Sequence, residues 1–280
     1  MRYVKLKNGV EMPMLGFGTF LIANHEQCVE AVSHALNIGY RHIDTAARYG
    51  NESAVGEAIK KSKIKRKDLF VTTKVWIYDA GYERAKIAFD LSLQKLGLDY
   101  VDLYLVHQPF GDYYGSWRAM EELYQSGKCR AIGVSNFLPD RLVDISLNNK
   151  VVPLVNQMEF HPYFQQQQGI ATMNELGVVL QGWAPFAQGK NDIFKDKILN
   201  DIAKKYSKTV SQIILNWHIQ RGICAIPKSV SEDRIKQNFD IFDFELAKSD
   251  IESINAMDTK VPFSNALDPV RAKNMIQLKR

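Results

Sequence analysis

Short runs of β-branched and aromatic residues alternate with longer segments of helical periodicity along most of this 280-residue chain. Strands that alternate with helices indicate parallel βαβ units. Eight such strands between residues 14 and 229 match a closed (β/α)8 barrel in number and in size. The predicted strands are residues 14–19, 41–46, 69–75, 101–107, 130–135, 154–159, 178–184 and 224–229.

Helical patterns fill most of the connections between these strands. They cover residues 26–37, 82–96, 117–126, 138–147, 169–176 and 210–221. Glycine accepts the left-handed conformation that commonly ends a helix. We therefore expect five helices to end at the glycines that follow them, which are Gly39, Gly97, Gly127, Gly177 and Gly222.

The two ends of the chain lie outside this alternation. Asn8-Gly9 between residues 4–7 and 10–12 is a strong hairpin signal, and this hairpin is expected to cover the bottom of the barrel. The tail from residue 259 to 280 is expected to reach over the active-site face. The alternative fold is a doubly wound Rossmann sheet, which needs G-x-G-x-x-G after the first strand. Only Gly16 and Gly18 of that motif are present, so we predict one barrel domain over residues 1–280.

Composition and charge exclude several classes of protein. With 46% hydrophobic and 24% charged residues the chain is not disordered, and its apolar stretches are too short to span a membrane. The start of the chain lacks the apolar segment of a signal peptide. A net charge of +5 is mild, and the basic run at residues 60–67 is interpreted as a solvated helix end, so we expect no nucleic-acid partner.

Three cysteines without a CxxC spacing indicate free thiols in a reducing compartment, which predicts a cytoplasmic location. No HExxH motif or cluster of Cys and His suggests a metal site.

Four ionisable side chains follow consecutive strands. Asp44 ends the second strand and Tyr49 follows it, while Lys74 and His107 end the third and the fourth. Chemistry in this fold is carried at the carboxyl ends of the strands. An ammonium about 4 Å from a phenol contributes about 4 kcal/mol at an effective dielectric of about 20, or about three pKa units. We therefore expect Lys74, held by Asp44, to make Tyr49 acidic, and His107 to aim a hydrogen bond at a substrate oxygen.

An aldolase that uses Lys74 as a Schiff base is an alternative reading of the same residues. It would require a lysine without a carboxylate partner, and Asp44 argues against it.

Four motifs resemble those of the aldo-keto reductases. The first is Gly39-Tyr40-Arg41-His42-Ile43-Asp44-Thr45-Ala46-Ala47-Arg48-Tyr49-Gly50-Asn51-Glu52. The others are Gly133-Val134-Ser135-Asn136-Phe137, Asn156-Gln157-Met158-Glu159-Phe160-His161-Pro162 and Ile226-Pro227-Lys228-Ser229-Val230. They occur in the family's order from the first strand to the last. Within the family the chain is most similar to the branch of 2,5-diketogluconate and methylglyoxal reductases.

The resemblance implies NADPH-dependent reduction of aldehydes and ketones on a (β/α)8 barrel. It assigns the proton donor to Tyr49, with Lys74 and Asp44 as its relay and His107 as the orienting group. It also implies a set of cofactor-binding residues, in which Ser135, Asn136 and Gln157 hold the nicotinamide carboxamide and Trp183 stacks on the ring. The remaining members of that set are Gly18, Thr19, Asp44, Phe186, Gln188 and Gly189.

The adenosine end of the cofactor has its own physical argument. Lys228, Ser229 and Arg234 precede or open a helix whose expected N-cap is Ser231. A helix N-terminus with two cations is an anion site, and the 2′-phosphate of NADPH is its natural occupant. Asn238, one turn beyond Arg234, is expected to offer its amide to adenine.

The substrate pocket is expected to be partly aromatic. Tyr49 and His107 would be joined there by aromatic residues from the loops after the first, third and fourth strands, which are Phe20, Trp76, Phe110, Tyr113 and Tyr114. Two positions depart from the family pattern. Gln108 precedes Pro109 where many relatives have Trp, and Gln237 stands where an acidic residue often assists Asn238.

We therefore expect a monomeric reductase that acts on a small carbonyl substrate. The alternative is a module of the same fold that binds NADPH for a partner without turnover.

Overall fold

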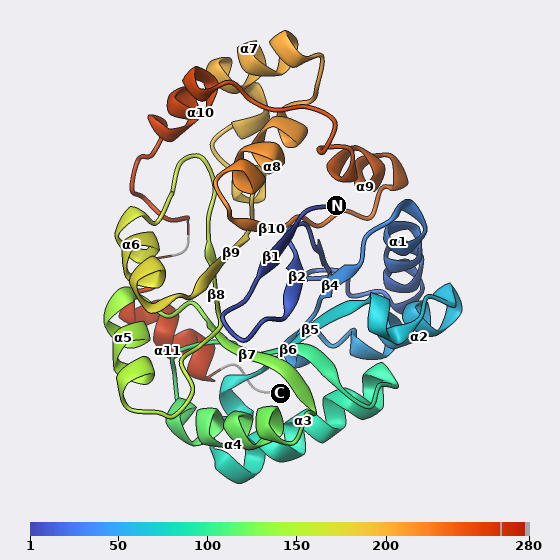
Figure 1. Ribbon diagram of the computed structural model, residues 1–280, viewed down its shortest axis with the longest axis vertical. Helices are drawn as coiled ribbons and strands as arrows, with labels where there is room; N and C mark the ends of the chain where they lie inside the picture. The colour runs from blue at the N-terminus through green and yellow to red at the C-terminus, as the bar shows by residue number, and fades with distance from the viewer. Residues whose placement is uncertain (264, 278–280) are drawn as a thin grey trace.

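Eight parallel strands form a barrel in the computed structural model, which describes residues 1–263 and 265–277 (Figure 1). The sheet runs in chain order from β3 to β10, and neighbouring strands are parallel. The strands are β3 Phe17–Gly18, β4 His42–Asp44, β5 Phe70–Val75, β6 Val101–Val106, β7 Cys129–Ser135, β8 Val155–Glu159, β9 Val179–Trp183 and β10 Cys224–Ile226. The predicted (β/α)8 barrel is confirmed.

The first strand closes the barrel against the last. Leu15 forms a parallel bridge with Ala225, and the Gly16 amide donates to the Ala225 carbonyl at 2.9 Å. The Gly18 amide likewise donates to the Pro227 carbonyl at 2.9 Å. A Cβ at Gly18 would lie 2.9 Å from Ile226 Cγ2, so only glycine lets the two backbones approach this closely.

Helices surround the barrel (Figure 1). They are α1 His25–Ile38, α2 Glu52–Ser62, α3 Tyr82–Leu96, α4 Tyr113–Gln125, α5 Pro139–Leu147, α6 Gln167–Leu176, α7 Lys197–Tyr206, α8 Val210–Gln220, α9 Glu232–Phe239, α10 Lys248–Asn255 and α11 Pro269–Gln277. Each glycine predicted to end a helix has a positive φ, which confirms those five boundaries. The residue pattern did not predict α7, a second helix between β9 and β10, nor α10 and α11 after the last strand.

The barrel wall is buried on both sides, since every residue of β5 and β6 is buried. Strands that are covered on both faces are typical of parallel sheets. Helix α8 is buried over nearly its whole length, whereas α11, at the other extreme, has no buried residue. Its start is fixed by a capping box, in which Thr209 and Gln212 bond each other's backbone amides.

The N-terminal hairpin closes the bottom of the barrel, as predicted. It consists of β1 Tyr3–Lys5 and β2 Glu11–Pro13, and it lies across the centre of the ring (Figure 1). Asn8 at its tip donates to the Arg130 carbonyl at 3.0 Å, near the start of β7. Met12 of β2 is fully buried.

The C-terminal tail crosses the opposite, carboxyl end of the strands. The Phe263 amide donates at 2.8 Å to Glu159, the last residue of β8. The Phe263 ring contacts Trp183, the last residue of β9, with centroids 5.5 Å apart. The predicted position of the tail is therefore confirmed for this part, while residues 264 and 278–280 lie outside the described residues.

Cys28, Cys129 and Cys224 are free and buried. Across residues 1–263 and 265–277, no helix has the length and apolar character needed to cross a bilayer. The same residues contain no group of three or more His, Cys, Asp or Glu side chains that could hold a metal ion.

Replacing Gly56 of α2 with alanine should destabilise the protein. Glycine to alanine in a helix usually gains about 1 kcal/mol. Here a Cβ would lie 2.4 Å from the Leu96 carbonyl oxygen at the end of α3, so the two helices must separate. We expect Gly56→Ala to lower the free energy of unfolding by roughly 1–3 kcal/mol in urea titrations.

Gly169→Ala in α6 is the matched control for this substitution. The nearest atom to its added Cβ would be 3.5 Å away, an ordinary contact. This variant should be as stable as the parent or more stable. A Gly56→Ala variant that gains stability as Gly169→Ala does would contradict the packing argument.

Candidate active site

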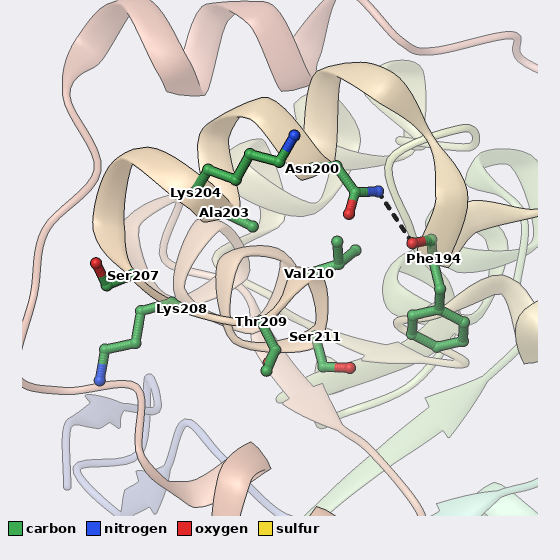
Figure 2. Close-up of a pocket in the computed structure, with 9 residues that line it drawn as sticks. All are labelled: Phe194, Asn200, Ala203, Lys204, Ser207, Lys208, Thr209, Val210 and Ser211. Carbon is green, nitrogen blue, oxygen red and sulfur yellow. Dashed lines mark hydrogen bonds between the residues drawn. The ribbon is translucent and has the colours of Figure 1, made fainter.

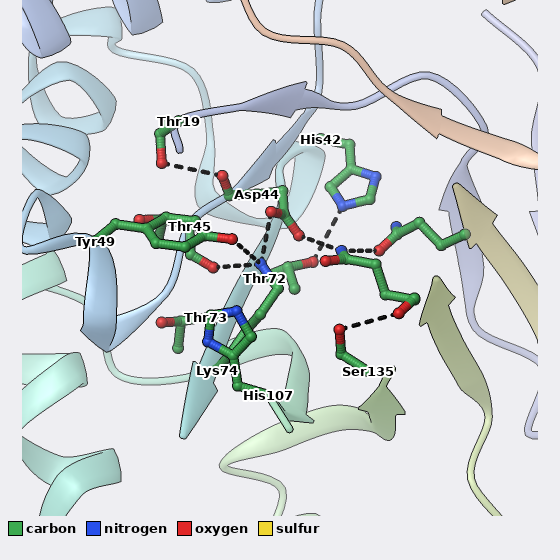
Figure 3. A network of polar contacts seen from close by, with 12 residues as sticks. Thr19, His42, Asp44, Thr45, Tyr49, Thr72, Thr73, Lys74, His107 and Ser135 are labelled. Carbon is green, nitrogen blue, oxygen red and sulfur yellow. Dashed lines mark hydrogen bonds and ion pairs between the residues drawn. The ribbon is translucent and has the colours of Figure 1, made fainter. Parts of the chain in front are cut away.

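Lys74 lies at the centre of the predicted acid–base group and is fully buried (Figure 3). Its Nζ donates to Asp44 Oδ1 at 2.6 Å and to the Thr45 carbonyl at 2.8 Å. The Tyr49 hydroxyl lies 3.5 Å from the same nitrogen. An ammonium has three protons to donate, so these three oxygens account for all of them.

Three short elements place these groups. Asp44 is the last residue of β4, and Lys74 lies in the adjacent strand β5. Tyr49 ends the single 3-10 turn η1 (Ala47–Tyr49) that follows β4. Because both strands are parallel and neighbours, their carboxyl ends bring the three side chains together, as the sequence predicted.

His107 follows β6 and completes the group. Its ring meets the Tyr49 ring edge to face, with centroids 5.6 Å apart. Burial holds the pKa of His107 well below its ordinary value of 6.5, and the cations Lys74 and Arg48 lower it further. His107 is therefore a neutral imidazole at physiological pH, able to donate one hydrogen bond and to accept another.

The predicted acidic tyrosine is wrong. The pKa of Tyr49 is raised well above its ordinary value of 10, first by burial and then by the charge of Asp44. Lys74 does not offset these effects, since Asp44 is bonded to it at 2.6 Å and cancels its positive charge. Tyr49 is thus a phenol that keeps its proton at every physiological pH.

Asp44 is supported by Gln157, which is in turn bonded to Gln181. Gln157 Nε2 donates to Asp44 Oδ2 at 2.7 Å and also to Gln181 Oε1. Gln157 was predicted as a cofactor residue, whereas Gln181 was not predicted at all. The sequence shows Gln181 only as a polar residue in the middle of a predicted strand. It could be recognised as a site residue only if its side chain were known to point into the barrel.

Asn51 is a second group that the sequence reasoning missed. Its Nδ2 donates to the carbonyls of Thr19 at 2.9 Å and Ile22 at 3.1 Å. Its Oδ1 accepts from the Thr45 hydroxyl at 2.9 Å. Asn51 therefore ties the loop after β3 to the segment that carries Tyr49. Thr19 adds to this tie, because its hydroxyl donates to the Asp44 carbonyl at 3.1 Å.

The residues predicted at the nicotinamide end form one hydrogen-bonded row. Asn136 Nδ2 donates to the His107 carbonyl and to Ser135 Oγ, both at 3.0 Å. Trp183 Nε1 donates to Asn136 Oδ1 at 3.0 Å, and the Ser135 hydroxyl donates to the Gln157 carbonyl at 3.0 Å. The structure thus brings these predicted residues together along the ends of β7, β8 and β9, directly beside His107.

The loop after β9 has a strained backbone. Phe186, Gln188 and Gly189 lie in it, and Gln188 has a φ of 54°. Other non-glycine residues here also have left-handed backbones, namely Ala184, Ala187, Asn191 and Asp192. Such strain often concentrates in segments that contact ligands.

The residues predicted for the adenosine phosphate lie at the start of α9. Ser231 caps the helix, since its side chain accepts from the Arg234 amide. Ser229 is buried and its hydroxyl accepts from the Ser231 amide at 3.1 Å. Within the described residues, the cations of Lys228 and Arg234 have no carboxylate within 4.0 Å. The buried Asn238 side chain likewise has no hydrogen-bond partner in that part of the chain.

The aromatic residues predicted for the substrate pocket divide into two groups. Phe20 contacts the Tyr49 ring with centroids 5.0 Å apart, and Trp76 contacts the His107 ring at 4.9 Å. Tyr113 and Tyr114 instead belong to the first turn of α4 and stack on each other at 4.9 Å. Phe110 is partly buried in the turn between β6 and α4.

A surface cavity of about 410 Å³ lies away from all of these residues (Figure 2). Its walls come from α7, α8 and the turns beside them. They consist of Phe194, Asn200, Ala203, Lys204, Ser207, Lys208, Thr209, Val210 and Ser211. None of the catalytic, cofactor-binding or substrate-binding residues predicted from the sequence lines this cavity.

Comparison with known proteins agrees with this geometry. The model of the aldo/keto reductase family matches residues 14–259. The chain is 47% identical to glyoxal reductase of Bacillus subtilis over 91% of its own length and 92% of that protein. It is 42% identical to methylglyoxal reductase DkgA of Escherichia coli, over 91% and 93% of the two chains.

A solved structure resembles the chain as well. The crystal structure of a Bombyx mori aldo-keto reductase in complex with NADP superposes with a TM-score of 0.90. The two sequences are 34% identical, and the match covers 98% of this chain and 97% of that one.

Replacing Asp44 with asparagine should destabilise the protein strongly. The change leaves the buried Lys74 without a counter-charge, and breaking a buried pair in this way costs about 3–5 kcal/mol. The pKa of Lys74 is already lowered by burial, with Asp44 opposing that effect, and it should fall further in the variant. The folded variant then binds fewer protons than its unfolded chain, so its stability should rise with pH between 7 and 9.

Urea titrations at pH 7 and pH 9 measure this effect. The double variant Asp44→Asn/Lys74→Met removes the unpaired charge and should regain most of the lost free energy of unfolding at pH 7. Equal losses in the single and the double variant would show that the ion pair is not the cause.

Proposed function

The chain belongs to the aldo/keto reductase family and is an NADPH-dependent oxidoreductase, and from that premise we propose that it reduces small aldehydes and ketones with Tyr49 as the proton donor. The observation that carries this proposal is the position of the Tyr49 hydroxyl, which lies 3.5 Å from Lys74 Nζ on a ring that meets the His107 ring edge to face. A carbonyl oxygen placed between Tyr49 and His107 would meet two hydrogen-bond donors at once.

The chain has groups suited to each end of the cofactor. Ser135, Asn136, Gln157 and Trp183 would hold the nicotinamide end. Lys228 and Arg234 would hold the 2′-phosphate, since neither has a carboxylate partner in the described part of the chain. Asn238 would meet the adenine, because its side chain makes no hydrogen bond within the described residues although the residue is only 5% exposed. When bound, NADPH supplies the hydride that reaches the carbonyl carbon.

The raised pKa of Tyr49 changes how the proton moves. A resting phenolate could not act as an acid, whereas Tyr49 keeps its proton until negative charge develops on the substrate oxygen. An alkoxide is more basic than a phenolate, so it takes this proton. The phenolate that remains would accept a hydrogen bond from Lys74 Nζ, 3.5 Å away, and Asp44 holds that nitrogen in place.

His107 orients the substrate in this scheme. Because its pKa lies well below 6.5, it is neutral, and its ring N–H donates to the carbonyl oxygen without competing for the proton of Tyr49.

Two similar relatives are named glyoxal reductase and methylglyoxal reductase. Their names support short aldehydes as the substrates of this chain. We further propose that the protein acts as a monomer in the cytoplasm. The three buried free thiols support a reducing compartment.

Replacing Tyr49 with phenylalanine should abolish most of the reduction. The substitution removes the proton donor and keeps the ring that packs against Phe20 and His107. General acid catalysis contributes about 10²–10⁴-fold, so we expect kcat for methylglyoxal to fall by that factor. Oxidation of NADPH followed at 340 nm measures it.

Binding of NADPH should be retained in Tyr49→Phe, which fluorescence titration checks. Full activity in this variant would defeat the assignment of Tyr49. A parent protein that binds NADPH tightly and turns over no carbonyl would instead support the module that only binds the cofactor.

The rate of reduction should not titrate between pH 6 and pH 9. The pKa of Tyr49 lies above this window and that of His107 lies below it, so both groups stay neutral throughout. A profile of kcat/KM against pH should therefore be flat. A loss of activity centred near pH 6.5 would show that His107 titrates normally, and one centred near pH 8 would contradict the raised pKa of Tyr49.

A further inference from the structure

Glu159 is a buried carboxylate that takes no part in the acid–base group. It is the last residue of β8 and is only 4% exposed. Its Oε1 accepts from the Phe263 amide at 2.8 Å and from His161 Nε2 at 3.0 Å. Its Oε2 has no hydrogen-bond partner among residues 1–263 and 265–277. A carboxylate with so few hydrogen bonds is costly to bury, which indicates that its bond to the C-terminal tail has a function.

The Phe263 ring contacts side chains from three segments at the carboxyl end of the barrel. Trp183 at the end of β9 meets it edge to face, with centroids 5.5 Å apart. Lys190 Nζ, from the loop after β9, lies 4.5 Å from the centre of the ring. The ring of His161, just after β8, stacks beside it at 6.2 Å. One side chain of the tail therefore joins the ends of two strands and the loop that follows the second.

Two contacts fix the orientation of the Trp183 indole. Its Nε1 donates to Asn136 Oδ1 at 3.0 Å, which holds one edge of the ring. A single hydrogen bond leaves an indole free to tilt about that edge, and the perpendicular Phe263 ring opposes the tilt. The nicotinamide is expected to stack on Trp183, so the plane of the indole decides how well that stack forms.

We propose that Glu159 and Phe263 are positioning residues for the cofactor, which hold Trp183 in the plane where the nicotinamide ring of NADPH stacks. The carboxylate fastens the tail, and the Phe263 ring supports the indole and the loop after β9. The inference rests on the proposed function, since it takes Trp183 as the platform for the nicotinamide. The proposed adenosine ligands lie instead at the start of α9, so only one end of the cofactor should depend on the tail.

Phe263→Ala should speed the release of NADPH and leave the binding of adenosine 2′-monophosphate unchanged. The loss of one edge-to-face aromatic pair corresponds to about a two- to tenfold change, so the dissociation rate should rise by that factor. Displacement of NADPH followed by stopped-flow fluorescence measures the rate. Calorimetric titration with adenosine 2′-monophosphate reports on the adenosine end alone, and a variant whose whole fold is loosened would lose affinity for both ligands.

Two control variants separate the ring from the rest of the tail. Phe263→Tyr keeps an aromatic ring and should release NADPH within about twofold of the parent rate. Val261→Ala shortens a tail side chain that is 66% exposed, and its release rate should match that of the parent. Circular dichroism and thermal unfolding establish that each variant is folded.

Glu159→Met tests the attachment of the tail. It keeps the length of the side chain and removes the acceptor of the Phe263 amide, so it should speed NADPH release as Phe263→Ala does. Because both changes break one chain of contacts, the double variant should release NADPH no faster than the faster single variant. Additive effects would show that Glu159 does not act through Phe263. If Glu159→Met does not fold, the Phe263 variants still decide the proposal.

The remaining outcomes separate this role from the proposed function. A Phe263→Ala variant that releases NADPH at the parent rate would overturn the positioning role, and so would slower release, the result expected if the ring obstructs the cofactor. Equal weakening of NADPH and adenosine 2′-monophosphate would overturn it as well. A parent protein that binds NADPH and reduces no carbonyl would overturn the proposed function and leave the positioning role intact. A parent protein that does not bind NADPH would overturn both.

Discussion

The buried ion pair between Lys74 and Asp44 determines the arrangement of the groups around it. Both side chains are almost fully removed from solvent, and a pair in such a place is tolerated only when every remaining proton and lone pair is bonded. The Thr45 carbonyl and the Gln157 amide meet that requirement. Their positions in turn fix the ends of β4, β5 and β8 relative to one another, and the Tyr49 hydroxyl takes the direction that is left to the ammonium.

The same ion pair explains why the pKa of Tyr49 was predicted in the wrong direction from residue types alone. Counting only the lysine predicts an acidic phenol, but Asp44 neutralises the lysine, and burial penalises the phenolate. The arrangement therefore holds the proton on Tyr49 in the resting protein. In the proposed mechanism Lys74 acts through its hydrogen bond to the Tyr49 oxygen, and that bond strengthens as the proton leaves, which is where differential stabilisation raises a rate.

Sequence periodicity was sufficient to predict the barrel and the acid–base residues at the carboxyl ends of its strands, because both predictions depend on where each strand ends. Asp44, Lys74 and His107 could be placed together for that reason. Asn51 and Gln181 could not, since their partners are backbone carbonyls of another loop and a side chain from another strand. Helix α7 was missed although its apolar side chains recur at helical spacing, at Ile198, Leu199, Ile202, Ala203 and Tyr206, so the residue pattern was sufficient to predict it.

Residue type alone describes the substrate pocket incompletely. Trp76 was predicted as part of an aromatic wall, and its ring lies against His107. An indole nevertheless has a polar edge, which is costly to bury without an acceptor. Gln108 next to His107 adds an equally unpaired acceptor at a position where an aromatic residue would have left none.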